Sequence, residues 1–221
     1  GGAANIIDTI QVGDADEVAG NAKFEADVKA TAIAVEGGDA SEDSVAEFNS
    51  TVAGAITLDD VASKGSAKVI FSGSTGTRAA SVVGESDGDG TVQVTGTALT
   101  LSGRIGQTGI GTMDVDATAT MTNLLDAQVV DIATGTTFTI DDDFTGDATT
   151  VNGTGKIVFD VDGDGAATTA VTAVIDADAD GSGTLQFTNT SLTTVTGNVG
   201  VTKQIGTIDA DKSVTFVGIL D

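Results

Sequence analysis

Three segments of the chain contain alternate carboxylates followed by glycine, a pattern that can bind a hard cation. They are Glu85-Ser86-Asp87-Gly88-Asp89-Gly90, Asp160-Val161-Asp162-Gly163-Asp164-Gly165 and Asp176-Ala177-Asp178-Ala179-Asp180-Gly181. In a tight loop such carboxylates converge on one point, and the glycine permits the sharp bend that calcium coordination requires. The predicted calcium ligands are Glu85, Asp87, Asp89, Asp160, Asp162, Asp164, Asp176, Asp178 and Asp180.

None of the three segments is a complete EF-hand loop. That loop closes with a bidentate Glu at its twelfth position, and the corresponding residues here are Gly96, Val171 and Phe187. Any calcium must therefore take further ligands from backbone carbonyls, water or a neighbouring strand. The alternative interpretation is that Asp-Gly clusters are ordinary turn sequences. Asp141–Asp143 and Asp209–Asp211 are poorer candidates, expected at a solvated strand end and in a turn.

Acid–base catalysis is not expected, although paired carboxylates could in principle perform it. The chain has 33 acidic residues, so some pair falls at a suitable separation by accident, and nothing marks one pair out. It has no His and no Cys, which removes the commonest general base and the thiol nucleophile. Arg78 and Arg104, the only arginines, are expected to be isolated surface charges. We therefore expect a protein that is not an enzyme.

Composition predicts an all-β fold. Of the 221 residues 40% are apolar but only 4% are aromatic, so the core must consist of Val, Ile, Leu and Ala with eight Phe. The rest is dominated by Gly, Thr, Ser and Asp. Branched residues favour strands, and Gly and Asp favour turns.

The formal net charge is −24, from nine basic and 33 acidic residues. Nucleic acid is excluded as a partner because so few basic residues cannot form the clustered surface that a phosphate backbone requires. Self-repulsion on this scale destabilises a compact state, so we expect divalent cations or salt to offset it. No apolar run approaches the roughly 20 residues that span a bilayer. The opening Gly1–Ala4 is typical of a mature secreted product or an excised fragment.

An internal duplication divides the chain. Gly90–Thr100 reads closely like Gly183–Thr193, and matches continue on both sides with small insertions. This pattern predicts an N-terminal strand region over 1–53, a first repeat unit over 54–118 and a second over 119–221, unless the whole forms one continuous domain.

Strand openings that begin with glycine recur at nearly regular intervals, at Gly65, Gly90, Gly111, Gly135, Gly155, Gly183 and Gly206. Their spacing favours a β-solenoid whose coils each contain roughly 20–28 residues. Tandem β-sandwich modules of the jelly-roll or immunoglobulin-like kind remain the alternative, because a unit of about 90 residues with six or seven strands also suits that fold.

Two stretches of the sequence have apolar patterns that predict longer elements. From Phe24 to Ala34 the even-numbered residues are apolar or small, which predicts one long half-buried strand with Ala32 and Ala34 on its buried face. Met121–Ile132 has apolar residues at helical spacing, so a short helix there and two further strands stay open as alternatives.

The segments Val195–Gly200, Ile205–Ala210 and Ser213–Gly218 resemble the repeats of large alphaproteobacterial surface proteins. These are the β-strand-repeat proteins and the autotransporter passengers of the rickettsial outer-membrane antigen type. The resemblance covers about 183–218 well and 90–116 in part. It implies extracellular or cell-surface display, a repetitive β fold and a role in adhesion or surface coats.

The leading functional expectation is a secreted structural protein within a surface layer, a filament or an adhesin stalk, stabilised by calcium. The apolar segments Ile6–Val12 and Val214–Leu220 are plausible edge strands for pairing with a neighbouring subunit, giving a homo-oligomer or polymer. The alternative is a monomeric binding module for a glycan, a host receptor or ice. Outward threonines, as in Thr136–Thr139 and Thr188–Thr194, favour that alternative, although β propensity explains many of them.

Overall fold

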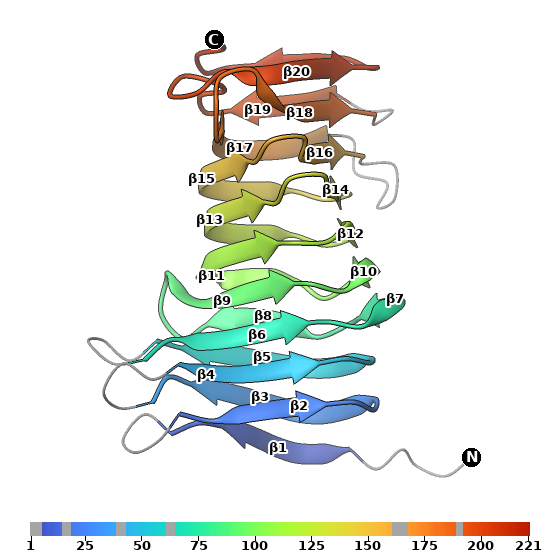
Figure 1. The fold of residues 1–221 in the computed structure, drawn as a ribbon, viewed down its shortest axis with the longest axis vertical. Coiled ribbons are helices and arrows are strands. Elements are labelled where there is room, and N and C mark those ends of the chain that lie inside the picture. The colour runs from blue at the N-terminus through green and yellow to red at the C-terminus, as the bar shows by residue number, and fades with distance from the viewer. Residues whose placement is uncertain (1–5, 15–18, 39–42, 61–64, 161–167, 189–191) are drawn as a thin grey trace.

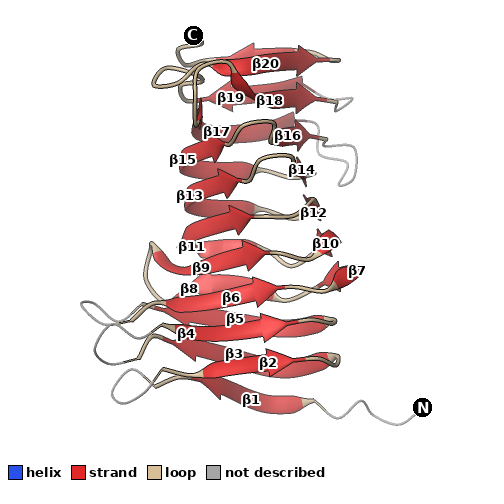
Figure 2. Ribbon diagram, viewed as in Figure 1, coloured by secondary structure: helices blue, strands red, loops and turns tan. Residues whose placement is uncertain are grey.

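A computed structural model describes residues 6–14, 19–38, 43–60, 65–160, 168–188 and 192–221. The chain is an all-β solenoid of about eight turns whose strands pair in parallel, which confirms the sequence prediction (Figures 1 and 2). The β-sandwich alternative is wrong because every pairing between named strands is parallel, whereas sandwich modules are built from antiparallel strands.

Within the residues that the structure describes, 21 strands form two sheets. The fourteen-stranded sheet contains β1 (Ile7–Val12), β2 (Asn21–Phe24), β3 (Val28–Glu36), β4 (Ser44–Phe48), β5 (Val52–Asp59), β6 (Ala67–Phe71), β8 (Ser81–Gly84), β9 (Asp89–Val94), β11 (Ile105–Val115), β13 (Leu125–Ile132), β15 (Phe144–Val151), β17 (Thr168–Ala177), β19 (Leu192–Thr196) and β21 (Val214–Phe216). The seven-stranded sheet contains β7 (Ser74–Arg78), β10 (Thr97–Leu101), β12 (Ala119–Met121), β14 (Thr137–Ile140), β16 (Lys156–Phe159), β18 (Ser182–Phe187) and β20 (Ile205–Ala210).

The cross-section of the solenoid changes along its axis. In the first coils, β2 leads to β3 and β4 leads to β5 across short corners, so the described part of each coil has strands only in the larger sheet. From β7 onward each coil also contributes a strand to the seven-stranded sheet. β7 is therefore an edge strand in the middle of the molecule, and Figure 1 shows it projecting beyond the coils below.

Equivalent positions stack one above another through the whole described chain. One inward column contains Ile10, Ile33, Ile56, Val82, Ile105, Leu125, Phe144, Val171, Val195 and Phe216. The shortest step along the sequence runs from Leu125 to Phe144, and the longest runs from Phe144 to Val171. Insertions between coils are accommodated in the connections, so the stacking of the core continues unbroken.

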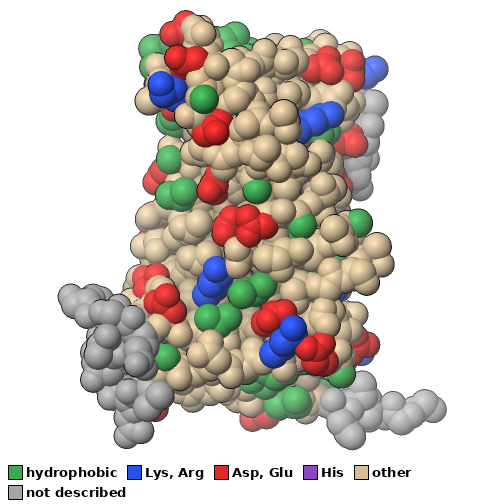
Figure 3. Space-filling view, viewed as in Figure 1, with side chains coloured by type: hydrophobic (Ala, Val, Ile, Leu, Met, Phe, Trp, Pro, Cys, Tyr) green, Lys and Arg blue, Asp and Glu red, His purple; other side chains and the backbone are tan. Residues whose placement is uncertain are grey.

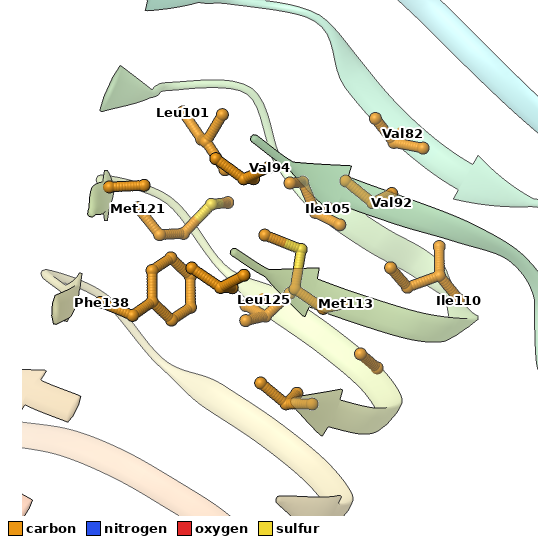
Figure 4. Packing of buried hydrophobic residues seen from close by; sticks show 14 of the residues in the cluster. Val82, Val92, Val94, Leu101, Ile105, Ile110, Met113, Met121, Leu125 and Phe138 are labelled. Atoms are coloured by element: carbon orange, nitrogen blue, oxygen red, sulfur yellow. The ribbon is translucent and has the colours of Figure 1, made fainter. Parts of the chain in front are cut away.

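The core is a continuous apolar stack. Figure 4 shows its central part, where side chains from β8 to β14 point into one interior, among them Val92, Met113 and Phe138. All three are completely buried. Because each coil contributes a few aliphatic side chains that pack on those of the next coil, a chain with few aromatic residues still builds a dry core.

The phenylalanines stack in two short ladders. Phe24 and Phe48 have ring centroids 4.9 Å apart and nearly parallel planes. Phe159 and Phe187 on the seven-stranded sheet are 5.1 Å apart. Aromatic pairs in such geometry contribute about 0.5–1.5 kcal/mol beyond the area they bury, so these ladders reinforce the two ends of the stack.

Two predictions about local secondary structure have different outcomes. The single strand predicted over Phe24–Ala34 is wrong: the chain turns at residues 25–27, and β3 pairs with β5 through a register irregularity between Lys29 and Ala32. The irregularity shifts the alternation by one residue. Ile33 and Val35 therefore face the core, and Ala32 is exposed. Of the two alternatives for Met121–Ile132, the structure has the strands.

The segments matched by the duplication lie on different sides of the coil. Gly90–Thr100 runs through β9, in the larger sheet, and then β10, in the smaller one. Its counterpart Gly183–Thr193 runs through β18, in the smaller sheet, and reaches β19, in the larger one. Strand pairing continues across the predicted boundary at 118 and 119, because β10 pairs with β12 and β11 with β13. The described residues include no helix long and apolar enough to cross a membrane.

Candidate functional sites

The first carboxylate motif forms a corner between β8 and β9. Gly90, within β9, has a φ of 77°, a conformation that favours glycine. Asp89 turns back on its own loop and accepts a hydrogen bond from the Ser86 backbone N–H at 2.7 Å. Glu85 instead lies against Asp59 on the coil below. The carboxylates of Glu85 and Asp89 therefore have different partners.

The second motif falls largely outside the described residues. Only Asp160 is described, and Asp162 and Asp164 are not. Asp160 follows β16, and its backbone N–H donates to the Ile140 carbonyl at 3.0 Å. Its carboxylate lies near that of Asp141 on the preceding coil, where the two repel each other.

The third motif forms the corner between β17 and β18, and its carboxylates accept hydrogen bonds from backbone groups of the adjacent coils. Asp176 Oδ1 accepts from the Thr202 N–H at 3.0 Å. Asp178 Oδ1 accepts from the Gly153 N–H at 2.9 Å and from the Ser182 hydroxyl. These bonds hold the pKa of Asp178 below its usual value.

Asp180 completes the third motif. Its Oδ1 accepts a 3.3 Å hydrogen bond from the Gln204 N–H and lies 4.0 Å from the Lys203 ammonium. Among the residues described, no group of three or more acidic side chains is arranged to hold a metal ion. The sequence motifs thus locate corners where carboxylates join one coil to another, and calcium binding at them stays a prediction.

One set of neighbouring acidic side chains was not predicted from the sequence, because it arises between coils. On the outer face of the larger sheet Gln93, Asp114 and Asp131 occupy neighbouring strands in register. The Gln93 amide donates to Asp114 at 3.0 Å and to Asp116 at 2.6 Å. Burial, and then repulsion by Asp116 and Asp131, raise the pKa of Asp114.

A second acidic column lies at a corner of the larger sheet. Glu36 and Asp59 are direct register partners, and Glu85 follows on the next coil. A hydrogen bond with Asp59 and repulsion from it raise the pKa of Glu85.

Among the residues that the structure describes, Asp141 has the largest pKa shift. Burial, with repulsion from Asp160 second, raises the pKa of its carboxyl to about 6. Neighbouring Asp142 differs, because its carboxylate accepts a 2.7 Å hydrogen bond from the Asp143 N–H. The expected solvated strand end at Asp141–Asp143 therefore contains one half-buried carboxyl that destabilises the coil when it ionises.

A column of threonines occupies the outer face of the seven-stranded sheet. Thr77, Thr100, Thr120 and Thr139 are direct register partners on β7, β10, β12 and β14. The column continues with Val158, Gln186 and Asp209. The sequence indicated Thr-rich strands, but the spacing between these four residues differs from coil to coil, so only the register shows that they align.

Arg78 is not the surface charge that the sequence suggested. It is the register partner of Leu101 on the inward column and is only 2% exposed. One terminal nitrogen, Nη2, donates to the Ser72 carbonyl at 2.6 Å. Burial lowers its pKa, and the charge of Asp27 opposes that effect. Side chains alternate between the two faces of a strand. Thr77 points outward, so Arg78, the next residue of β7, points inward at the place where β7 meets the lower coils.

A shallow open groove runs along β15, β17 and β19. It has a volume of about 240 Å³, and Thr145, Thr172 and Thr196 line it on register-paired strands. Asp147 is the only acidic residue of its lining. The groove offers hydroxyl groups and one carboxylate, without a nucleophile beside a general base.

Together these observations define a parallel β-solenoid whose sides differ in charge. Comparisons with family models, with curated proteins and with solved structures found no match to this chain. The resemblance of residues 183–218 to surface-protein repeats therefore stays a prediction.

Proposed function

We propose that this chain is a structural segment of an extracellular or cell-surface assembly, in which coil stacks on coil to form an extended rod. The observation that supports this proposal is the continuous parallel register from β1 to β21. In a solenoid each coil contacts only its neighbours, so length is gained without a change in the contacts within a coil. Such a rod suits a filament, a stalk or a surface layer.

The two ends of the described stack support the same proposal. Ile7 pairs with Ala30, which is buried on the inner side of β3, and is 50% exposed. Leu220 pairs with the fully buried Val199 and is 49% exposed. Both residues occupy core positions that lack a covering coil among the described residues, and the edges beside them expose backbone groups able to pair with a further strand. A further coil, from this chain or from another copy, would bury both.

We also propose that calcium acts as a counter-ion that stabilises the folded chain. The net charge of −24 and the two acidic columns support it, because carboxylates on successive strands repel one another. Oxygen-rich clusters of this kind favour calcium over transition metals. The ion would link corners of successive coils, where Glu85 lies against Asp59.

The test is the assembly state of the 221-residue chain. We expect native protein at high concentration to form end-to-end rods, visible by negative-stain electron microscopy and as concentration-dependent mass in sedimentation. A double variant, Ile7→Lys with Leu220→Lys, places charge on both end surfaces and should remain monomeric. Circular dichroism of the variant checks that the fold is kept.

Val129 supplies the matched control. It is 42% exposed, but it lies on the outer face of β13, away from both ends. The variant Val129→Lys should assemble like the native chain. Native protein that stays monomeric at every concentration, or equal loss of assembly in the Val129 and end variants, would overturn the proposal.

A further inference from the structure

The threonine column forms part of a regular hydroxyl array. The residue two positions before each column member is also at least partly exposed, within β7, β10 and β14 and directly before β12. These positions are Thr75, Ala98, Thr118 and Thr137, so seven of the eight outer positions are Thr. We call these eight residues the threonine face. Ala98, with a φ of 55°, is its one interruption.

The spacing of the face follows from β geometry. Neighbouring strands lie about 4.8 Å apart, and residues two positions apart on one parallel strand are separated by about 6.6 Å. The pairing of Thr77, Thr100, Thr120 and Thr139 shows no register shift, unlike several pairings of the larger sheet. The hydroxyls of these four threonines therefore form an evenly spaced row, flanked on three of the four coils by Thr75, Thr118 and Thr137. The Thr118 hydroxyl accepts a 3.2 Å hydrogen bond from the Thr137 N–H.

The chemistry of the face is as uniform as its spacing. None of its eight positions is charged, in a chain with 33 acidic and nine basic residues. Strand propensity alone does not explain this, because the equivalent outer column of the larger sheet contains Gln93, Asp114 and Asp131. A hydroxyl beside a methyl at each threonine offers one hydrogen bond to water and one apolar contact.

We propose that the threonine face binds ice. Both repeats of the array lie close to the oxygen spacings on faces of hexagonal ice, so its hydroxyls can take part in an ice-like layer of water. A charged side chain would orient water around itself and break that layer, so an uncharged face is required. The strands are fixed by their neighbours, so little conformational freedom is lost on binding. This function is independent of end-to-end assembly.

The experiment is an ice-recrystallisation assay of the full chain, with thermal hysteresis as a second readout. We expect native protein to stop crystal growth at a concentration at which a non-binding protein of similar size has no effect. Thr120→Lys places a charge in the middle of the face and should abolish the inhibition. Thr77→Lys, on exposed edge strand β7, gives the same test if the Thr120 variant is unfolded.

Thr150 provides the matched control. It is a half-buried outward residue that continues the column of Asp131 on the larger sheet. Thr150→Lys should inhibit recrystallisation as well as native protein does. Absence of inhibition by the native chain overturns the proposal, and so does equal loss in folded Thr150→Lys and Thr120→Lys variants.

Discussion

Two outer columns of the same three coils carry opposite chemistry. On the larger sheet the column is Gln93, Asp114 and Asp131, and on the smaller sheet it is Thr100, Thr120 and Thr139. Within each coil the two column members are close together in the sequence, and they cover the same core. The fold determines which positions face outward, but it does not determine which residue types occupy those positions.

The difference shows that the charge of −24 is not distributed evenly around the rod. Figure 3 shows acidic and basic side chains spread over the face that contains β2, β4, β6 and β9. In the acidic column there, burial and then repulsion from Asp116 and Asp131 raise the pKa of Asp114, whereas the threonine column has no ionisable groups to repel one another. Segregation of this kind leaves the outer positions of β7, β10, β12 and β14 uncharged on a strongly anionic molecule, whereas Lys156 and Asp209 follow on β16 and β20 of the same sheet.

The largest expected effect comes from the core that supports the threonine column. Phe138 lies between Thr137 and Thr139 on β14, points inward and is completely buried. Phe138→Ala should lower the free energy of unfolding by about 3–5 kcal/mol, because a buried ring is replaced by a cavity. Urea denaturation followed by circular dichroism measures this loss.

Thr139→Ala is the control on the same strand. Its side chain points outward, so we expect a change within about 0.5 kcal/mol. A similar cost for the Phe138 and Thr139 variants would mean that the outward column, and not the core beneath it, stabilises this sheet.

Calcium should next distinguish the acidic corner column of Glu36, Asp59 and Glu85 from the threonine column. At about 100 times its dissociation constant, an ion that binds only the folded state adds about 2.7 kcal/mol of stability. We expect the melting temperature to rise with calcium more than with sodium chloride at equal ionic strength, and a chelator to reverse the rise. Glu85→Gln should reduce the increment because it removes a carboxylate beside Asp59.

Thr120→Ala, on the uncharged column, should leave the calcium increment unchanged. Coincident melting curves in calcium and in sodium chloride would show that screening alone relieves the repulsion between carboxylates. The proposed stabilising role of calcium would then be wrong.

The sequence predicted the fold well because the signals are local. Short apolar alternation bounded by Gly and Asp defines strands, and the near-regular recurrence of glycine at strand openings predicted stacked coils. The prediction failed where a single residue changes the alternation. The irregularity between Lys29 and Ala32 sends Ala32 outward, and no composition signal marks it.

The candidate sites were predicted less well because they depend on register between coils. The spacing within Asp176–Asp180 indicated converging carboxylates, but backbone N–H groups of Thr202 and Gly153 bind them from neighbouring coils. The interval of sequence from Asp114 to Asp131 is shorter than the interval from Thr100 to Thr120, although each pair joins adjacent coils. Because the coils differ in length, neither column can be found by searching the sequence for a fixed period.

The smallest expected effect is the pH dependence of stability, where two kinds of carboxyl oppose each other. Asp141 has a pKa of about 6 in the folded protein and 3.8 as its ordinary value, so the folded state takes up the proton first. Stability should therefore rise as pH falls from about 6 towards 4. Asp27, Asp43 and Asp178 have lowered pKa values, so the stability they contribute is lost below about pH 4.

The variant Asp141→Asn separates these two effects. It should raise the free energy of unfolding at pH 7.5 by about 1 kcal/mol after allowance for solvent screening, which corresponds to a melting temperature about 2–4 °C higher. The gain should vanish near pH 4, where the native Asp141 is already protonated. Asp142→Asn should give no gain, because the hydrogen bond from the Asp143 N–H then goes to a neutral amide oxygen and is weaker than the bond to a carboxylate. Equal gains in both variants would mean that general relief of negative charge, and not the buried position beside Asp160, governs the acid side of the stability curve.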